Sequence, residues 1–248
     1  MTLIATGVSI YVSRHMDQIG PAVIATAIGV MAAACFVWVE LKSRAPLDDY
    51  VVLLGALLIS ADAGFIESQW HPFGEQWQRH LLLLAIVHAA IAYWFESRGV
   101  LSLSIVALAG WLGIEQHNLF SSSVDLGVRA FVCAAILVVW RIVNHQPAFK
   151  PLFDQFAINF AFWGGLALTT DHSFRFLGLL MTIALGVGAV MWGFHEKREL
   201  YVMYAFIYTI IAINIVAAEP LLIMFSTIAG IVGLFVIHVA LQERMARS

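Results

Sequence analysis

The chain has 248 residues, of which 61% are hydrophobic and only 12% are charged, and its mean hydropathy is +0.88. Soluble domains carry about 25% charged residues, so a soluble fold of this size could not hide so much apolar surface. Thirteen Lys and Arg at a net charge of −3 exclude a nucleic-acid binder, and two cysteines within apolar runs exclude a disulfide scaffold. The composition predicts a polytopic membrane protein whose apolar solvent is the lipid bilayer.

Ten apolar runs follow one another along the chain, and each is a candidate transmembrane helix, which needs about 20 mainly apolar residues. They are residues 2–13, 21–41, 50–66, 81–95, 99–113, 124–143, 153–170, 174–194, 200–218 and 220–241. The first run is short, but it lacks the basic start and the small-residue cleavage site of a signal peptide. The runs predict an all-α bundle of about ten spans, forming a single domain over residues 1–248.

The basic residues orient the predicted bundle, because cytoplasmic connections are enriched in Lys and Arg. With the amino terminus in the cytoplasm, nine cations fall in inner connections and the tail: Lys42, Arg44, Arg98, Arg141, Lys150, Lys197, Arg198, Arg244 and Arg247. Only Arg14, Arg79, Arg175 and Arg129 fall toward the outer side. Four tryptophans lie near inner clusters, as expected of headgroup anchors: Trp38, Trp94, Trp140 and Trp192. We therefore predict that both termini are cytoplasmic.

Histidines and carboxylates gather at the predicted outer face. A candidate polar site there comprises Asp62, Glu67, Arg129, His80, Glu115, His117, Asp171 and His172. Such residues could bind a metal or handle an anion or a proton, or they could form an ordinary solvated membrane rim. Since no pair has the spacing of a metal-ligand motif, the sequence assigns no metal site and predicts no cofactor, and metal binding by the outer histidines stays open.

Several polar side chains lie deeper within predicted spans. Asp62 stands among small residues that would let another helix approach, and its carboxylate needs a proton or a cationic partner, for which Arg129 is the candidate. His88, Asn159 and Asn214 are interpreted first as groups that hydrogen-bond within the bundle.

Motifs in the first 115 residues resemble a known family. They include Ile19-Gly20-Pro21, Leu54-Gly55-Ala56-Leu57-Leu58, Gln69-Trp70-His71, Trp94-Phe95-Glu96-Ser97-Arg98 and Ala107-Leu108-Ala109-Gly110-Trp111-Leu112-Gly113. Together they resemble the bacterial membrane proteins grouped as domain of unknown function 2157. The cytoplasmic helical segment with which such proteins usually begin is missing here, and His15-Met16-Asp17 stands where the family commonly has Asn-Trp. The resemblance implies a multi-pass protein of the bacterial cytoplasmic membrane and supplies no activity.

Three classes of function fit the sequence. The default is a non-catalytic membrane subunit or scaffold, with the bilayer and other membrane proteins or copies of itself as partners and with no nucleic acid. The alternatives are a transporter or ligand-binding protein that uses the outer polar site, and an intramembrane enzyme acting on a lipid-linked substrate. The absence of proline-broken helices and of helically spaced ligands favours the default class.

Overall fold

A computed structural model describes residues 20–41, 47–72, 74, 79–114, 124–196, 198–217, 223, 227–230, 232–233 and 235. Over these residues the chain is helical and contains no strand, which confirms the predicted all-α class. The helices are α2 (Pro21–Leu41), α3 (Asp48–Trp70), α4 (Arg79–Phe95), α5 (Arg98–Trp111), α6 (Val124–Val143), α7 (Lys150–Thr170), α8 (Arg175–His195) and α9 (Glu199–Ala217). The predicted span 2–13 and most of the predicted span 220–241 lie outside the described residues.

Eight predicted spans coincide with these eight helices. The bounds of α2 and α6 match to the residue, whereas α3 begins two residues before and ends four residues after its apolar run. Asp48 and Asp49 occupy the first turn of α3, where negative side chains interact favourably with the helix dipole. Likewise, α7 starts earlier than its apolar run because Pro151 suits a first turn, where its missing N–H has no bond to lose.

Five of the described helices are long and apolar enough to cross a membrane, judged by length and composition: α2, α3, α6, α8 and α9. Helices α4 and α5 are apolar but shorter, at 17 and 14 residues. Helix α7 has 21 residues, but Asp154, Gln155 and Asn159 lower its hydropathy and it is not among the five. These helices suit a membrane protein, and the total of about ten spans stays a prediction.

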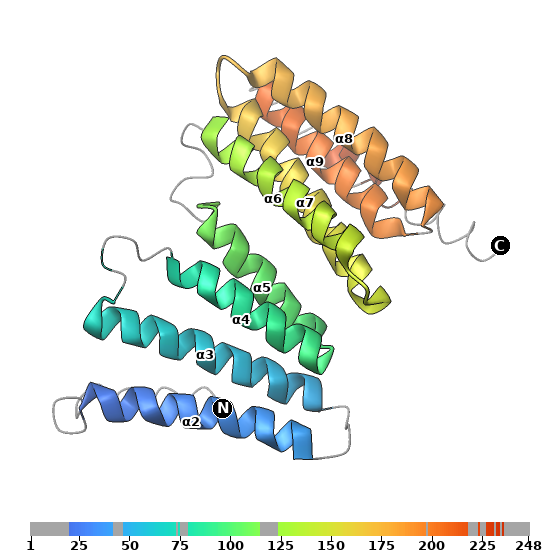
Figure 1. Cartoon of the computed structure of the whole chain (residues 1–248). Coiled ribbons are helices and arrows are strands. Elements are labelled where there is room, and N and C mark those ends of the chain that lie inside the picture. Colours follow the sequence, from blue (N-terminus) through green and yellow to red (C-terminus); the bar gives the residue numbers. More distant parts are fainter. Residues whose placement is uncertain are drawn as a thin grey trace. The chain divides into compact units, whose positions relative to one another are not determined.

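The chain packs as two compact units, unit 1 (residues 1–111) and unit 2 (residues 112–248). In unit 1, α2 packs against α3 and α4 against α5 (Figure 1). In unit 2, α7 packs against α6, α8 and α9 and is therefore the central helix. The prediction that residues 1–248 form a single domain stays a prediction.

Glycines let the central helix of unit 2 approach its neighbours closely. A Cβ on Gly164 of α7 would lie 3.0 Å from the carbonyl oxygen of Gly127 on α6, so the two backbones touch there. A Cβ on Gly178 of α8 would meet the backbone of Thr169 and lie 2.7 Å from the carbonyl carbon of Leu168 on α7. Small residues at such crossings give van der Waals packing, which drives helix association in lipid.

Two glycines of α8 provide a matched test of this packing. Gly178→Ala should destabilise the protein by about 1–3 kcal/mol, because the new methyl group meets backbone that cannot move aside. Gly188→Ala, on the same helix, has nothing within 4 Å of the added carbon and should be neutral or slightly stabilising. Thermal unfolding of the purified protein in detergent measures both; equal Tm values for the two variants would contradict the packing described for α7 and α8.

Candidate functional site

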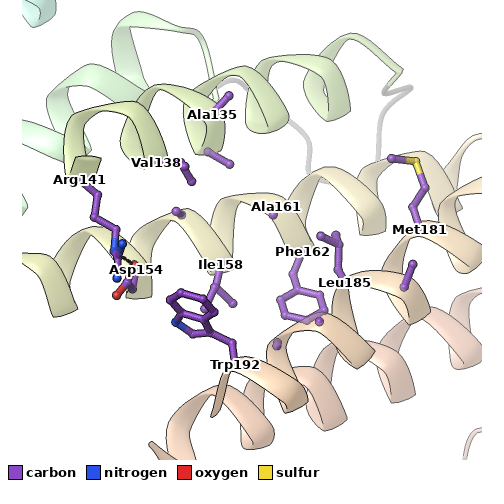
Figure 2. Close-up of a pocket in the computed structure, with 15 residues that line it drawn as sticks. Ala135, Val138, Arg141, Asp154, Ile158, Ala161, Phe162, Met181, Leu185 and Trp192 are labelled. Atoms are coloured by element: carbon purple, nitrogen blue, oxygen red, sulfur yellow. Dashed lines mark ion pairs between the residues drawn. The ribbon is translucent and has the colours of Figure 1, made fainter. Parts of the chain in front are cut away.

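A groove of about 670 Å³ lies on unit 2, between α6 and α8, with α7 as its floor (Figure 2). Its lining is almost wholly apolar and rich in small side chains, among them Ala135, Ala161 and Gly188. The groove is open along α8, where Ala184, Gly188 and Trp192 are exposed. Its volume falls within the range of about 300–1,000 Å³ that is usual for small-molecule sites.

The polar end of the groove is an ion pair between two helices. Arg141, in the last turn of α6, pairs through Nε with Oδ1 of Asp154, which lies one turn into α7 (Figure 2). The side chains are largely shielded, at 26% and 14% exposure, so each charge depends on the other for compensation. Asp154 also interacts electrostatically with Glu196 and Arg198, which follow α8.

An indole covers this ion pair. The guanidinium carbon of Arg141 lies 5.5 Å from the centre of the Trp192 ring, a cation–π distance. Trp140, beside Arg141, packs against Phe153 of α7 with the ring centroids 5.1 Å apart. Tryptophan and arginine near the ends of apolar helices are typical of the membrane–water interface, and here they lie together at the polar end of the groove.

On its other side, α7 is joined to α9 by a chain of hydrogen bonds. Gln155 Nε2 donates to the Tyr204 hydroxyl at 3.0 Å, the Tyr208 hydroxyl donates to Asn159 Oδ1 at 2.8 Å, and Trp163 Nε1 donates to the Tyr208 oxygen at 3.0 Å. These contacts confirm that Asn159 is an interhelical hydrogen-bonding group, and they hold the floor of the groove in place. The same prediction for Asn214 stays a prediction.

Three residues of the predicted outer polar site belong to unit 1. Asp62 and Glu67 lie on α3, and His80 lies in the first turn of α4. Ser60 of α3 lies level with His88 of α4, and the two helices are antiparallel, so Glu67 lies near the level of His80. The structure therefore brings these two candidates to the same end of unit 1.

Asp62 faces a glycine of the neighbouring helix. Its Oδ2 lies 3.5 Å from the position that a Cβ on Gly29 of α2 would take, in agreement with the expected close approach of a second helix. Its Oδ1 is buried and receives no hydrogen bond from the described residues. Asp62 and Arg129 belong to different units, and their predicted pairing stays a prediction.

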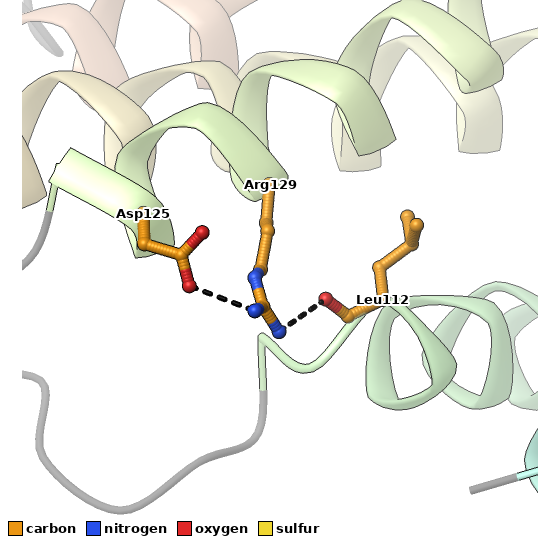
Figure 3. A network of polar contacts seen from close by, with 3 residues as sticks. All are labelled: Leu112, Asp125 and Arg129. Carbon is orange, nitrogen blue, oxygen red and sulfur yellow. Dashed lines mark hydrogen bonds and ion pairs between the residues drawn. The ribbon is translucent and has the colours of Figure 1, made fainter.

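Arg129 has two partners within unit 2. Its Nη2 lies 2.7 Å from Asp125 Oδ2, one turn earlier on α6, and its Nη1 donates to the Leu112 carbonyl at 3.3 Å (Figure 3). Gly113 has a φ of +76°, a backbone conformation that favours glycine, and the Arg129 guanidinium lies directly against it. Arg129 thus tethers the segment after α5 to α6.

The remaining outer candidates are not gathered into a site in the described part of the chain. Asp171 Oδ1 accepts hydrogen bonds from the backbone N–H groups of Ser173 and Phe174, which shapes the turn into α8, and His172 is exposed in that turn. Glu115 and His117 lie outside the described residues. Among the residues that the structure describes, no three His, Cys, Asp or Glu side chains are placed to hold a metal ion.

His88 makes the interhelical contacts expected of it. Its Nε2 lies 3.1 Å from the Ala56 carbonyl and 3.2 Å from Ser60 Oγ, both on α3. Because a carbonyl can only accept, Nε2 carries the proton. His88 therefore links α3 and α4 at the centre of unit 1.

Sequence reasoning missed the groove and its ion pair. From the sequence, Arg141 was interpreted only as a cytoplasmic cation and Trp192 only as a headgroup anchor. Asp154 was not singled out. The sequence did contain a signal for this pair. Arg141 lies near the end of one predicted span, and Asp154 lies near the start of the next span along the chain. Antiparallel neighbours place those two positions side by side.

Comparison with known proteins gives no match: no family model, no curated protein and no solved structure resembles the chain significantly. The resemblance to the domain of unknown function 2157 proteins therefore stays a prediction.

The ion pair can be tested with a double-mutant cycle. Asp154→Leu alone should cost about 2 kcal/mol or more, because it leaves the Arg141 guanidinium partly buried without its carboxylate. The double variant Arg141→Leu/Asp154→Leu should recover much of that loss, since no unpaired charge remains. Thermal unfolding in detergent measures the cycle, and additive effects of the two single substitutions would show that the pair does not couple α6 to α7.

Proposed function

We propose that this is a non-catalytic, multi-pass protein of the bacterial cytoplasmic membrane that binds an amphiphilic molecule of the bilayer in the groove of unit 2. The shape of the groove supports this proposal most directly. The groove is apolar, it is open on one side, and it ends at the Arg141–Asp154 pair. Amphiphiles have the same division between an apolar chain and a polar head.

The length of the groove supports this proposal. Along α8 it extends from Trp192 to Met181, which at 1.5 Å per residue is about 16 Å. The hydrocarbon core of a bilayer is about 30 Å thick, so one leaflet contributes about half of it. The length of the groove thus matches the thickness of the acyl-chain region of one leaflet, and its polar end would lie at the headgroups.

The described residues after α9 pack away from the groove of unit 2. A Cβ on Gly230 would lie 2.6 Å from Ile210 Cδ1, and one on Gly233 would lie 2.5 Å from the Phe206 ring, so these late residues pack against α9. None of the described residues after α9 lines the groove.

For the membrane topology, we propose about ten spans with both termini in the cytoplasm. The inner cations support it, and Arg141 and Arg198 then put the polar end of the groove at the cytoplasmic leaflet. Transport through an outer polar site and catalysis on a lipid-linked substrate stay predictions.

The topology can be tested at the two ends of α8. In a background without Cys35 and Cys133, His172→Cys should react with a membrane-impermeant maleimide added to intact spheroplasts, and His195→Cys should react only after permeabilisation. Both side chains are exposed, so side-chain access does not explain a difference between them. Labelling of position 195 alone in intact spheroplasts would overturn the proposed orientation.

The groove can be tested by filling it. Gly188→Leu places a side chain into open space within the groove, and it should weaken retention of phospholipid by the purified protein about tenfold. Gly64→Leu is the matched control, because Gly64 on α3 is also exposed with nothing within 4 Å of an added Cβ. Native mass spectrometry with a phosphatidylethanolamine–phosphatidylglycerol mixture measures lipid retention, and equal retention by the two variants would refute lipid binding in the groove.

A further inference from the structure

The described charged side chains that interact with Asp154 of the ion pair, together with Asp154 itself, are balanced in sign. Arg141 is paired with Asp154, and Asp154 also lies within electrostatic range of Arg198 and Glu196, so among the described residues two positive and two negative side chains act on one another. A site for a simple anion would instead carry an excess of positive charge.

Given the proposed function, we propose that the groove selects a zwitterionic phospholipid whose headgroup has an ammonium with N–H donors, that is, a phosphoethanolamine lipid. The guanidinium of Arg141 presents N–H groups to the phosphate, in the fork geometry that suits phosphate oxygens. The carboxylate of Asp154 accepts hydrogen bonds from the ammonium.

A phosphoethanolamine headgroup differs from an anionic headgroup because it can compensate the charges of both Arg141 and Asp154. An anionic headgroup could bind Arg141 only in competition with Asp154, and it would leave a carboxylate that is 14% exposed without its cation. A headgroup with one phosphate and one ammonium offers a partner to each member of the pair. A choline headgroup carries the same charges but has no N–H to donate, so it loses the hydrogen bonds to Asp154.

The ring of Trp192 restricts where the phosphate can lie. Because the indole lies against the Arg141 guanidinium, 5.5 Å from ring centre to Cζ, that face of the cation is already occupied. The phosphate then approaches the edge of the guanidinium, where its N–H groups point. This geometry places the headgroup beside the ion pair and the acyl chain along Ile158 and Gly188.

The experiment compares three lipids with identical acyl chains on the purified full-length protein. Native mass spectrometry should show that phosphatidylethanolamine binds about tenfold more tightly than phosphatidylglycerol or phosphatidylcholine, as expected for hydrogen bonds to a charged group. Asp154→Asn keeps the shape and removes the negative charge, so it should abolish the preference over phosphatidylglycerol or reverse it. Asp171→Asn, the same change in an exposed turn at the opposite end of α7, should leave the preference intact.

A second variant covers the case in which Asp154→Asn does not fold. Arg141→Gln/Asp154→Asn removes both charges and keeps polar side chains, and it should bind all three lipids with similar affinity. Equal binding of the three lipids by the unmodified protein, or a preference for phosphatidylglycerol, overturns the headgroup inference.

The failure of the proposed function gives a different result. If Gly188→Leu reduces binding of all three lipids but no headgroup preference exists, the groove binds lipid and only the selectivity is wrong. If Gly188→Leu changes nothing, the lipid does not occupy the groove and both proposals fail. If the protein purifies as a dimer that Gly188→Leu dissociates, a second copy fills the groove, which also overturns the headgroup inference.

Discussion

Hydrocarbon solvates polar side chains poorly, so the polar side chains of helix α7 need partners within the protein. Asp154, Gln155 and Asn159 each find a partner on a neighbouring helix: Arg141 of α6, Tyr204 of α9 and Tyr208 of α9. These contacts require α7 to lie inside unit 2, with α6 on one side and α9 on another. The central position of α7 is therefore a consequence of its polar residues.

The groove follows from the same arrangement. Glycines bring α7 close to α6 near Gly127 and Gly164, and to α8 near Gly178. Farther along, the facing positions carry alanines and Gly188, whose small side chains leave the space between α6 and α8 unfilled. The helices are thus held together at one end by backbone contact and at the other by the Arg141–Asp154 pair, and the groove lies between these two attachments.

The helices themselves were largely predictable, because a bilayer requires long apolar runs and the ends of those runs are marked by charges and prolines. The bounds of α2 and α6 followed directly from this rule, and α3 extended past its apolar run because Asp48 and Asp49 suit a helix start. The groove was not predictable in the same way. Hydropathy records how apolar a residue is, and it does not record which neighbour a polar residue will meet.

The sequence by itself determined the all-helical class, the positions of eight helices and the suitability of five of them for a membrane, since these depend only on local composition. The tertiary structure decided which distant polar groups meet: it paired Arg141 with Asp154, placed Arg129 against the Leu112 carbonyl, and placed Asp62 against Gly29. The physical reason is that such contacts depend on the rotation and pairing of helices. Those are fixed by glycine contacts and interhelical hydrogen bonds between residues far apart in the chain.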